Sequence, residues 1–103
     1  MEFLVEFDVT IPDGTSESEI GDRQRAEASA AAKLVAEGHL VRLWNRTVVG
    51  GKNTILGLYR AASDVELDDL LRALPLYDWM QVVVTPLGAH PNDPAAASAS
   101  RPA

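Results

Sequence analysis

The acidic residue Glu27 is the strongest candidate for chemistry in this sequence of 103 residues. In a helix that advances by about 100° per residue, Glu27 falls about 20° from Ile20 and about 40° from Ala31, in the middle of an apolar stripe. A carboxylate that loses hydration has a raised pKa, which suits a general base working near neutral pH. The alternative is that Glu27 turns to the helix edge, where it is solvated or paired with an arginine. Position alone leaves both interpretations open.

Weaker polar candidates lie before and after Glu27. Gln24 precedes it by about one helical turn and shares its face. Arg42, Trp44 and Arg46 share one face of a predicted strand by period two, and an arginine beside a tryptophan could hold a flat anionic substrate. An ordinary solvated strand face is the simpler alternative for these three residues. His90 stands at a predicted surface turn.

Composition excludes several classes of function. The chain has no cysteine, which rules out disulfides, thiolate nucleophiles and cysteine-based metal sites. Its two histidines are far apart in sequence, so we expect no metal site. The net charge is −6, with 15 acidic and 9 basic residues, so neither nucleic acid nor a membrane surface is an expected partner. The chain shows no secretory leader and no apolar run of bilayer length, and we expect a cytoplasmic protein.

Hydrophobic periodicity and turn residues predict four strands and two helices. Alternation of apolar and polar residues from Glu2 to Ile11 indicates a half-buried first strand, and Gly50-Gly51 a hairpin turn. The expected strands are residues 2–11, 40–49, 53–60 and 81–87, and the expected helices are residues 16–38 and 63–74.

Start and stop signals bound the two helices. Ser16 and Ser63 each precede a glutamate by three residues, the spacing of a capping box. Gly38 suits the left-handed residue that ends the first helix. The predicted buried stripes are Ile20, Ala31, Leu34, Val35 and Gly38 in the first helix, and Leu67, Leu70, Leu71 and Leu74 in the second.

The order βαββαβ is the split βαβ pattern of ferredoxin-like α+β domains. It predicts a four-stranded antiparallel sheet with both helices on one face. The other face, expected to carry Trp44 and Tyr59, must meet water or a second subunit, and a dimer that closes two sheets into a barrel would cover it. Residues 1–91 form this domain. Residues 92–103, rich in Ala, Ser and Pro, are predicted to be a flexible tail or an arm across a neighbouring subunit.

Short motifs along residues 1–91 resemble the muconolactone Δ-isomerase family. Their order and spacing carry the resemblance more than any single motif does. The matching stretches are Met1 to Val5, Glu37-Gly38 followed by Leu43-Trp44, Ser63 to Leu74, Pro75 to Met80, Thr85 to Leu87, and His90-Pro91.

The resemblance implies a cofactor-free isomerase of aromatic catabolism, in the β-ketoadipate pathway from catechol. Such an enzyme converts muconolactone into the 3-oxoadipate enol-lactone by a proton shift. A base removes a proton from the conjugated lactone, and a proton returns two carbons away. The family is ferredoxin-like and forms homodimers that assemble further, up to decamers, with sites between subunits.

The resemblance also implies roles for individual residues. Glu27 matches the family's first-helix glutamate and would be the base. Trp44, Asn53 and His90 match family positions and would contact the substrate, and Arg42 or Arg46 would bind its carboxylate. We also expect Gln24 and Tyr59 to contact the substrate. At Gln24 the family usually has a lysine or arginine.

Two other functions remain open at this stage. The aromatic set Trp44, Tyr59, Tyr77 and Trp79 could line a cavity for cofactor-free oxygenation of an activated aromatic compound. Gln24 and Ala89 stand where the family usually has basic residues, which favours a non-catalytic module for small-ligand binding or assembly.

Overall fold

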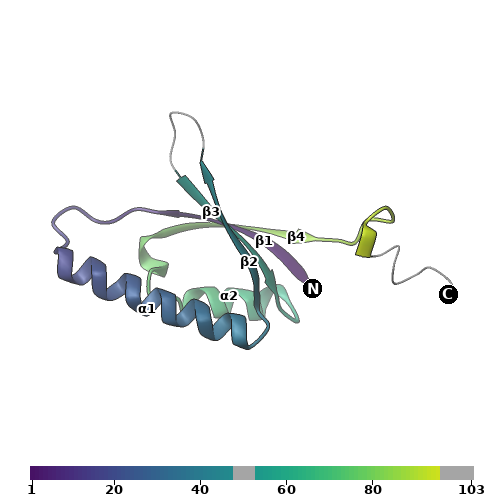
Figure 1. Ribbon diagram of the computed structural model, residues 1–103, viewed down its shortest axis with the longest axis horizontal. Helices are drawn as coiled ribbons and strands as arrows, with labels where there is room; N and C mark the ends of the chain where they lie inside the picture. The colour runs from purple at the N-terminus through teal and green to yellow at the C-terminus, as the bar shows by residue number, and fades with distance from the viewer. Residues whose placement is uncertain (48–52, 96–103) are drawn as a thin grey trace.

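A four-stranded antiparallel sheet, with both helices on one of its faces, forms the frame of the protein (Figure 1). The computed structural model describes residues 1–47 and 53–95. The strand order is β2-β3-β1-β4, so the predicted ferredoxin-like α+β fold is confirmed. The elements are β1 (Glu2–Val9), α1 (Glu17–Ala36), β2 (Leu40–Thr47), β3 (Asn53–Arg60), α2 (Asp64–Arg72), the short 3-10 helix η1 (Tyr77–Trp79) and β4 (Met80–Leu87).

The predicted helix caps are present at both helix starts and at the end of α1. The Ser16 hydroxyl accepts a hydrogen bond from the Glu19 N–H at 3.2 Å, and the Ser63 hydroxyl accepts one from the Glu66 N–H at 3.1 Å. These bonds satisfy amide groups that have no partner within the first helical turn. Gly38 ends α1 with a φ of +80°, a left-handed conformation that glycine adopts without steric cost.

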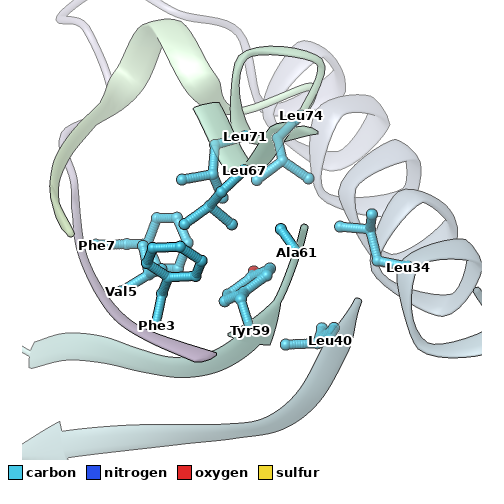
Figure 2. Packing of buried hydrophobic residues seen from close by; sticks show 10 residues of the cluster. All are labelled: Phe3, Val5, Phe7, Leu34, Leu40, Tyr59, Ala61, Leu67, Leu71 and Leu74. Atoms are coloured by element: carbon cyan, nitrogen blue, oxygen red, sulfur yellow. The ribbon is translucent and has the colours of Figure 1, made fainter. Parts of the chain in front are cut away.

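The hydrophobic core lies between the sheet and the two helices (Figure 2). Alternation along β1 turns Phe3, Val5 and Phe7 toward the helices, as the sequence predicted. The other members of this core are Leu34, Leu40, Tyr59, Ala61, Leu67, Leu71 and Leu74.

Tyr59 lies on the face of the sheet that the helices cover. The prediction that it lies on the opposite, open face is wrong. It pairs with Phe3 across β1 and β3, is 3% exposed, and its ring makes an edge contact with Phe7 at 6.0 Å between centroids. Gly57, two residues earlier, makes room for the ring, because a Cβ built there would lie 2.5 Å from Tyr59 Cε1. Trp44 does lie on the open face.

Two apolar residues are more exposed than their patterns predicted. β1 ends at Val9, so Ile11 lies beyond the sheet and is exposed. Val35 is 57% exposed, because α1 buries the side that carries Leu34, and Val35 is turned about 100° from it.

Parts of two predictions lie outside the described residues. These are the end of the second strand with the Gly50-Gly51 turn, and residues 96–103 of the tail. Within the described ranges, no helix has the length and apolar character needed to cross a membrane.

Candidate active site

A cavity of about 280 Å³ lies between α1, the covered face of the sheet and the segment that joins α2 to β4. This volume is near the lower end of the range of small-ligand sites, about 300–1,000 Å³. The polar side chains in its wall are Gln24, Glu27 and Tyr59. The remaining wall is apolar and includes Phe7, Val9, Ala28, Ala31, Leu43, Ile55, Leu76 and Met80.

Glu27 projects from the middle of α1 into this cavity wall and is half-buried. Its Oε1 atom accepts a hydrogen bond from the backbone N–H of Leu76 at 3.0 Å. Burial raises the pKa of the Glu27 carboxyl above its usual 4.5, and the hydrogen bond from Leu76 partly opposes this shift. The structure thus places the carboxylate in the apolar setting that the helical pattern predicted.

The Leu76 N–H is available because the chain leaves α2 just before it. α2 ends at Arg72, and the turn that follows directs this amide toward α1. The next amides are used within the turn, since the Tyr77 N–H donates to the Leu74 carbonyl at 3.0 Å and the Trp79 N–H to the Leu76 carbonyl at 2.9 Å. A backbone donor of this kind leaves no signal in the sequence.

Arg23 is a neighbour of this turn that sequence reasoning missed. Its Nη1 donates to the Pro75 carbonyl at 3.2 Å, and its guanidinium lies 4.4 Å from the centre of the Trp79 ring. A signal was present in the sequence, because four residues on a helix place Arg23 only about 40° from Glu27.

Tyr59 contributes a phenol to the same cavity wall. Burial, and secondarily the negative charge of Glu27, raise the pKa of Tyr59 to about 12. The phenol therefore keeps its proton at neutral pH and can donate a hydrogen bond to a ligand.

Arg42, Trp44 and Arg46 lie together on the open face of the sheet. Within a single chain, they are on the opposite side of the sheet from Glu27. The Arg42 guanidinium is 4.9 Å from the centre of the Trp44 ring. Arg46 pairs with Glu6 at 3.4 Å. Period two in β2 gives these residues one shared face, but it is the face opposite the cavity.

Asn53 and His90 are the two remaining predicted substrate contacts. Asn53 begins β3, and its side chain is outside the described part of the structure. His90 is exposed after β4, and its Nδ1 accepts the Asn92 N–H at 3.0 Å. Met80, the first residue of β4, lines the cavity, and the strand runs away from the cavity from there. His90 follows the end of β4, so it lies far from Glu27 within one chain.

The four aromatic residues of the oxygenase hypothesis do not share one cavity in a single chain. Tyr59 lines the cavity, Trp44 is on the opposite face, and Trp79 lies beneath Arg23. Tyr77 stacks beside Arg72, with the guanidinium 5.7 Å from its ring centre. Over residues 1–47 and 53–95, no three acidic or histidine side chains gather as a metal site would require.

Comparison with known proteins gives a consistent relationship. Residues 1–93 match the sequence model of the family described as muconolactone delta-isomerase. The muconolactone Δ-isomerase of Cupriavidus pinatubonensis is 33% identical over 92 residues, which cover 89% of this chain and 97% of that protein. Muconolactone Δ-isomerase 1 of Acinetobacter lwoffii is 34% identical over 93 residues, 89% of this chain and 93% of that protein.

A crystal structure of muconolactone isomerase has the same fold. It superimposes with a TM-score of 0.79 and 28% identity, covering 91% of this chain and 95% of that one. Sequence and structure agree over almost the whole described chain, and the protein belongs to the muconolactone Δ-isomerase family.

Proposed function

We propose that this protein is a cofactor-free isomerase that moves a carbon–carbon double bond within muconolactone or a closely related unsaturated lactone. The observation that carries the proposal is Glu27, a half-buried carboxylate in an apolar cavity with one oxygen fixed by the Leu76 N–H. The names of its relatives supply the substrate class. A proton shift needs a base, a dry site and a donor for the developing enolate, and these are the groups in the cavity wall.

Glu27 would act as both base and acid. Its Oε2 atom removes a proton from a carbon conjugated with the lactone carbonyl, which gives a dienolate and a protonated carboxyl. The same carboxyl then returns the proton two carbons away, so the double bond moves and no cofactor is consumed. Burial favours this role, because a raised pKa makes the carboxylate a stronger base and eases its protonation.

Tyr59 would stabilise the dienolate. Its phenol stays protonated, since its pKa is raised to about 12, and it can donate to the oxygen where negative charge develops. Gln24 adds an exposed amide at the cavity wall, where it can contact a substituent of the lactone.

The direct test is a spectrophotometric assay of the purified protein with muconolactone and its methyl and chloro analogues. Glu27→Gln keeps the shape of the side chain and removes the base, so we expect turnover to fall by about 10²–10⁴-fold. Glu37→Gln, an exposed change near the end of the same helix, is the matched control and should retain activity. Full activity of a folded Glu27→Gln protein would rule out this mechanism.

The protein would also form a homodimer through the open face of its sheet. That face exposes apolar side chains that include Trp44 and Val83, the latter 57% exposed. It also carries pairs of opposite charge, Arg46 with Glu6 and Arg60 with Glu2. A surface that mixes apolar groups and both charges can pair with a second copy of itself about a twofold axis. Arg42, Trp44 and Arg46 would then lie between subunits.

Sedimentation of two valine variants tests this assembly. Val83→Glu places a charge on the open face, at the edge strand β4, so we expect the dimer to dissociate. Val65→Glu is the control, because Val65 is 68% exposed on α2, away from that face. An unchanged mass for Val83→Glu would show that the open face is not the interface.

A further inference from the structure

One peptide group joins two charged side chains of α1. The N–H of Leu76 donates to Glu27 Oε1 at 3.0 Å, and the carbonyl of Pro75 accepts from Arg23 Nη1 at 3.2 Å. This N–H and this carbonyl belong to the same planar peptide unit. Arg23 and Glu27 are one helical turn apart, so the peptide lies across the two side chains like a bridge.

We propose that Arg23 acts on Glu27 through this bridging peptide, as a positioning residue for the proton shift. The guanidinium holds the peptide in place from its carbonyl side, which keeps the N–H on Oε1 and leaves Oε2 to carry the proton. A cation on the carbonyl also polarises the amide and makes its N–H a stronger donor. The inference rests on the proposed role of Glu27 as proton carrier.

Arg23 is itself held firmly enough for this role. Its guanidinium stacks over Trp79, which is 8% exposed, and its Nη1 lies 3.5 Å from Asp78 Oδ2. The guanidinium therefore contacts the Trp79 ring with its face, and the Pro75 carbonyl and the Asp78 carboxylate with Nη1. A lysine has no planar group to stack and a single charged nitrogen, so it would reproduce the charge but not the geometry.

Few other charges act on Glu27. Tyr59 of β3 is the other titratable side chain in the cavity wall. Asp78 and Glu19 lie beside Arg23 and not beside Glu27. The wall residues from β1, β2 and the end of α2 are apolar. Among the described residues, no salt bridge joins Arg23 to Glu27 directly, so the peptide is the contact through which the two groups are linked.

The test is a ¹³C NMR titration of the Glu27 carboxyl in the full chain, together with the pH profile of kcat/KM. The bridging hydrogen bond stabilises the carboxylate, so Arg23→Gln should raise the pKa of Glu27 further. The acidic limb of the profile should move to higher pH by the same amount. We also expect kcat on the plateau to fall about tenfold or more, since the base is held less well. Arg23→Lys should fall between wild type and Arg23→Gln.

Arg25→Gln is the matched control. Arg25 is an exposed arginine of the same helix, paired with Asp22 and absent from the cavity wall, so both readouts should stay at wild-type values. A folded Arg23→Gln protein whose Glu27 titration and acidic limb equal those of Arg25→Gln would overturn the proposal. If Arg23→Gln fails to fold, Arg23→Lys decides by the same criterion. If wild type converts no lactone, the proposed function fails, while the NMR titration still tests the link between Arg23 and Glu27.

Discussion

Charged side chains have different surroundings on the two faces of the sheet. On the helix-covered face, Glu27 meets an apolar wall and a single backbone amide, and its pKa rises. On the open face, Arg46 is paired with Glu6 and Arg42 is stacked on Trp44. The same alternation along the strands produces both faces, because successive side chains point to opposite sides.

The contrast separates chemistry from recognition. A charge in a solvated pair is stabilised on both partners and gains little reactivity. A carboxylate that has lost water, and that keeps only one hydrogen bond, becomes the better base. We therefore place proton transfer on the covered face and subunit contact on the open face.

The largest expected contrast is between two aromatic variants, one on each face. Tyr59→Phe removes the phenol that would stabilise the dienolate, and loss of one such donor typically costs about 10²–10³-fold in kcat. Trp44→Phe keeps an aromatic ring on the open face, so we expect kcat to change by less than about threefold. Steady-state kinetics with muconolactone, at matched subunit concentration, gives both values.

The same two variants can contradict the division between the faces. If Trp44→Phe lowered kcat as much as Tyr59→Phe while the dimer stayed intact, the open face would take part in the reaction. The active site would then be shared between subunits rather than contained in one.

The fold was predictable because its signals are local. Alternation from Glu2 onward, the caps at Ser16 and Ser63, and Gly38 each act within a few residues and fixed the element order. Glu27 was predictable for the same reason, since a helix converts sequence spacing into a face.

The rest of the site depends on contacts between distant segments. The Leu76 N–H reaches Glu27 over 49 residues of sequence, and a backbone donor has no residue type to mark it. Tyr59 was assigned to the wrong face because alternation within β3 does not say which set of side chains meets the helices. The pairing of Tyr59 with Phe3 decides that question, and only the sheet register provides it.

A smaller effect than that of Tyr59→Phe is expected from a substitution at Gly57, which lies against the Tyr59 ring and whose replacement should lower the stability of the fold. Gly57→Ala brings a methyl group 2.5 Å from Tyr59 Cε1, and overpacking of this kind costs about 1–3 kcal/mol. Urea unfolding followed by circular dichroism measures the change. Activity should also fall, because the displaced ring carries the phenol of the cavity wall.

Gly21→Ala is the matched control for this change. Gly21 lies within α1, and a methyl group there meets only the flexible end of Arg25 at 3.3 Å. Alanine is the better helix former, so this variant should be more stable by about 0.5–1 kcal/mol. Equal stability of Gly57→Ala and wild type would show that the Tyr59 ring can move away without loss.

The smallest expected effect is on the pH dependence of stability. The folded-state pKa of Glu27 lies above its ordinary 4.5, so between these two pKa values the folded protein binds more protons than the unfolded chain. The free energy of unfolding must therefore decrease as pH rises through this window. Glu27→Gln removes that slope, and the difference between wild type and variant in urea unfolding at a series of pH values isolates it from other carboxylates. Glu37→Gln should keep the wild-type slope, and if Glu27→Gln kept it too, the carboxyl would be solvated and the division between the two faces would lose its chemical basis.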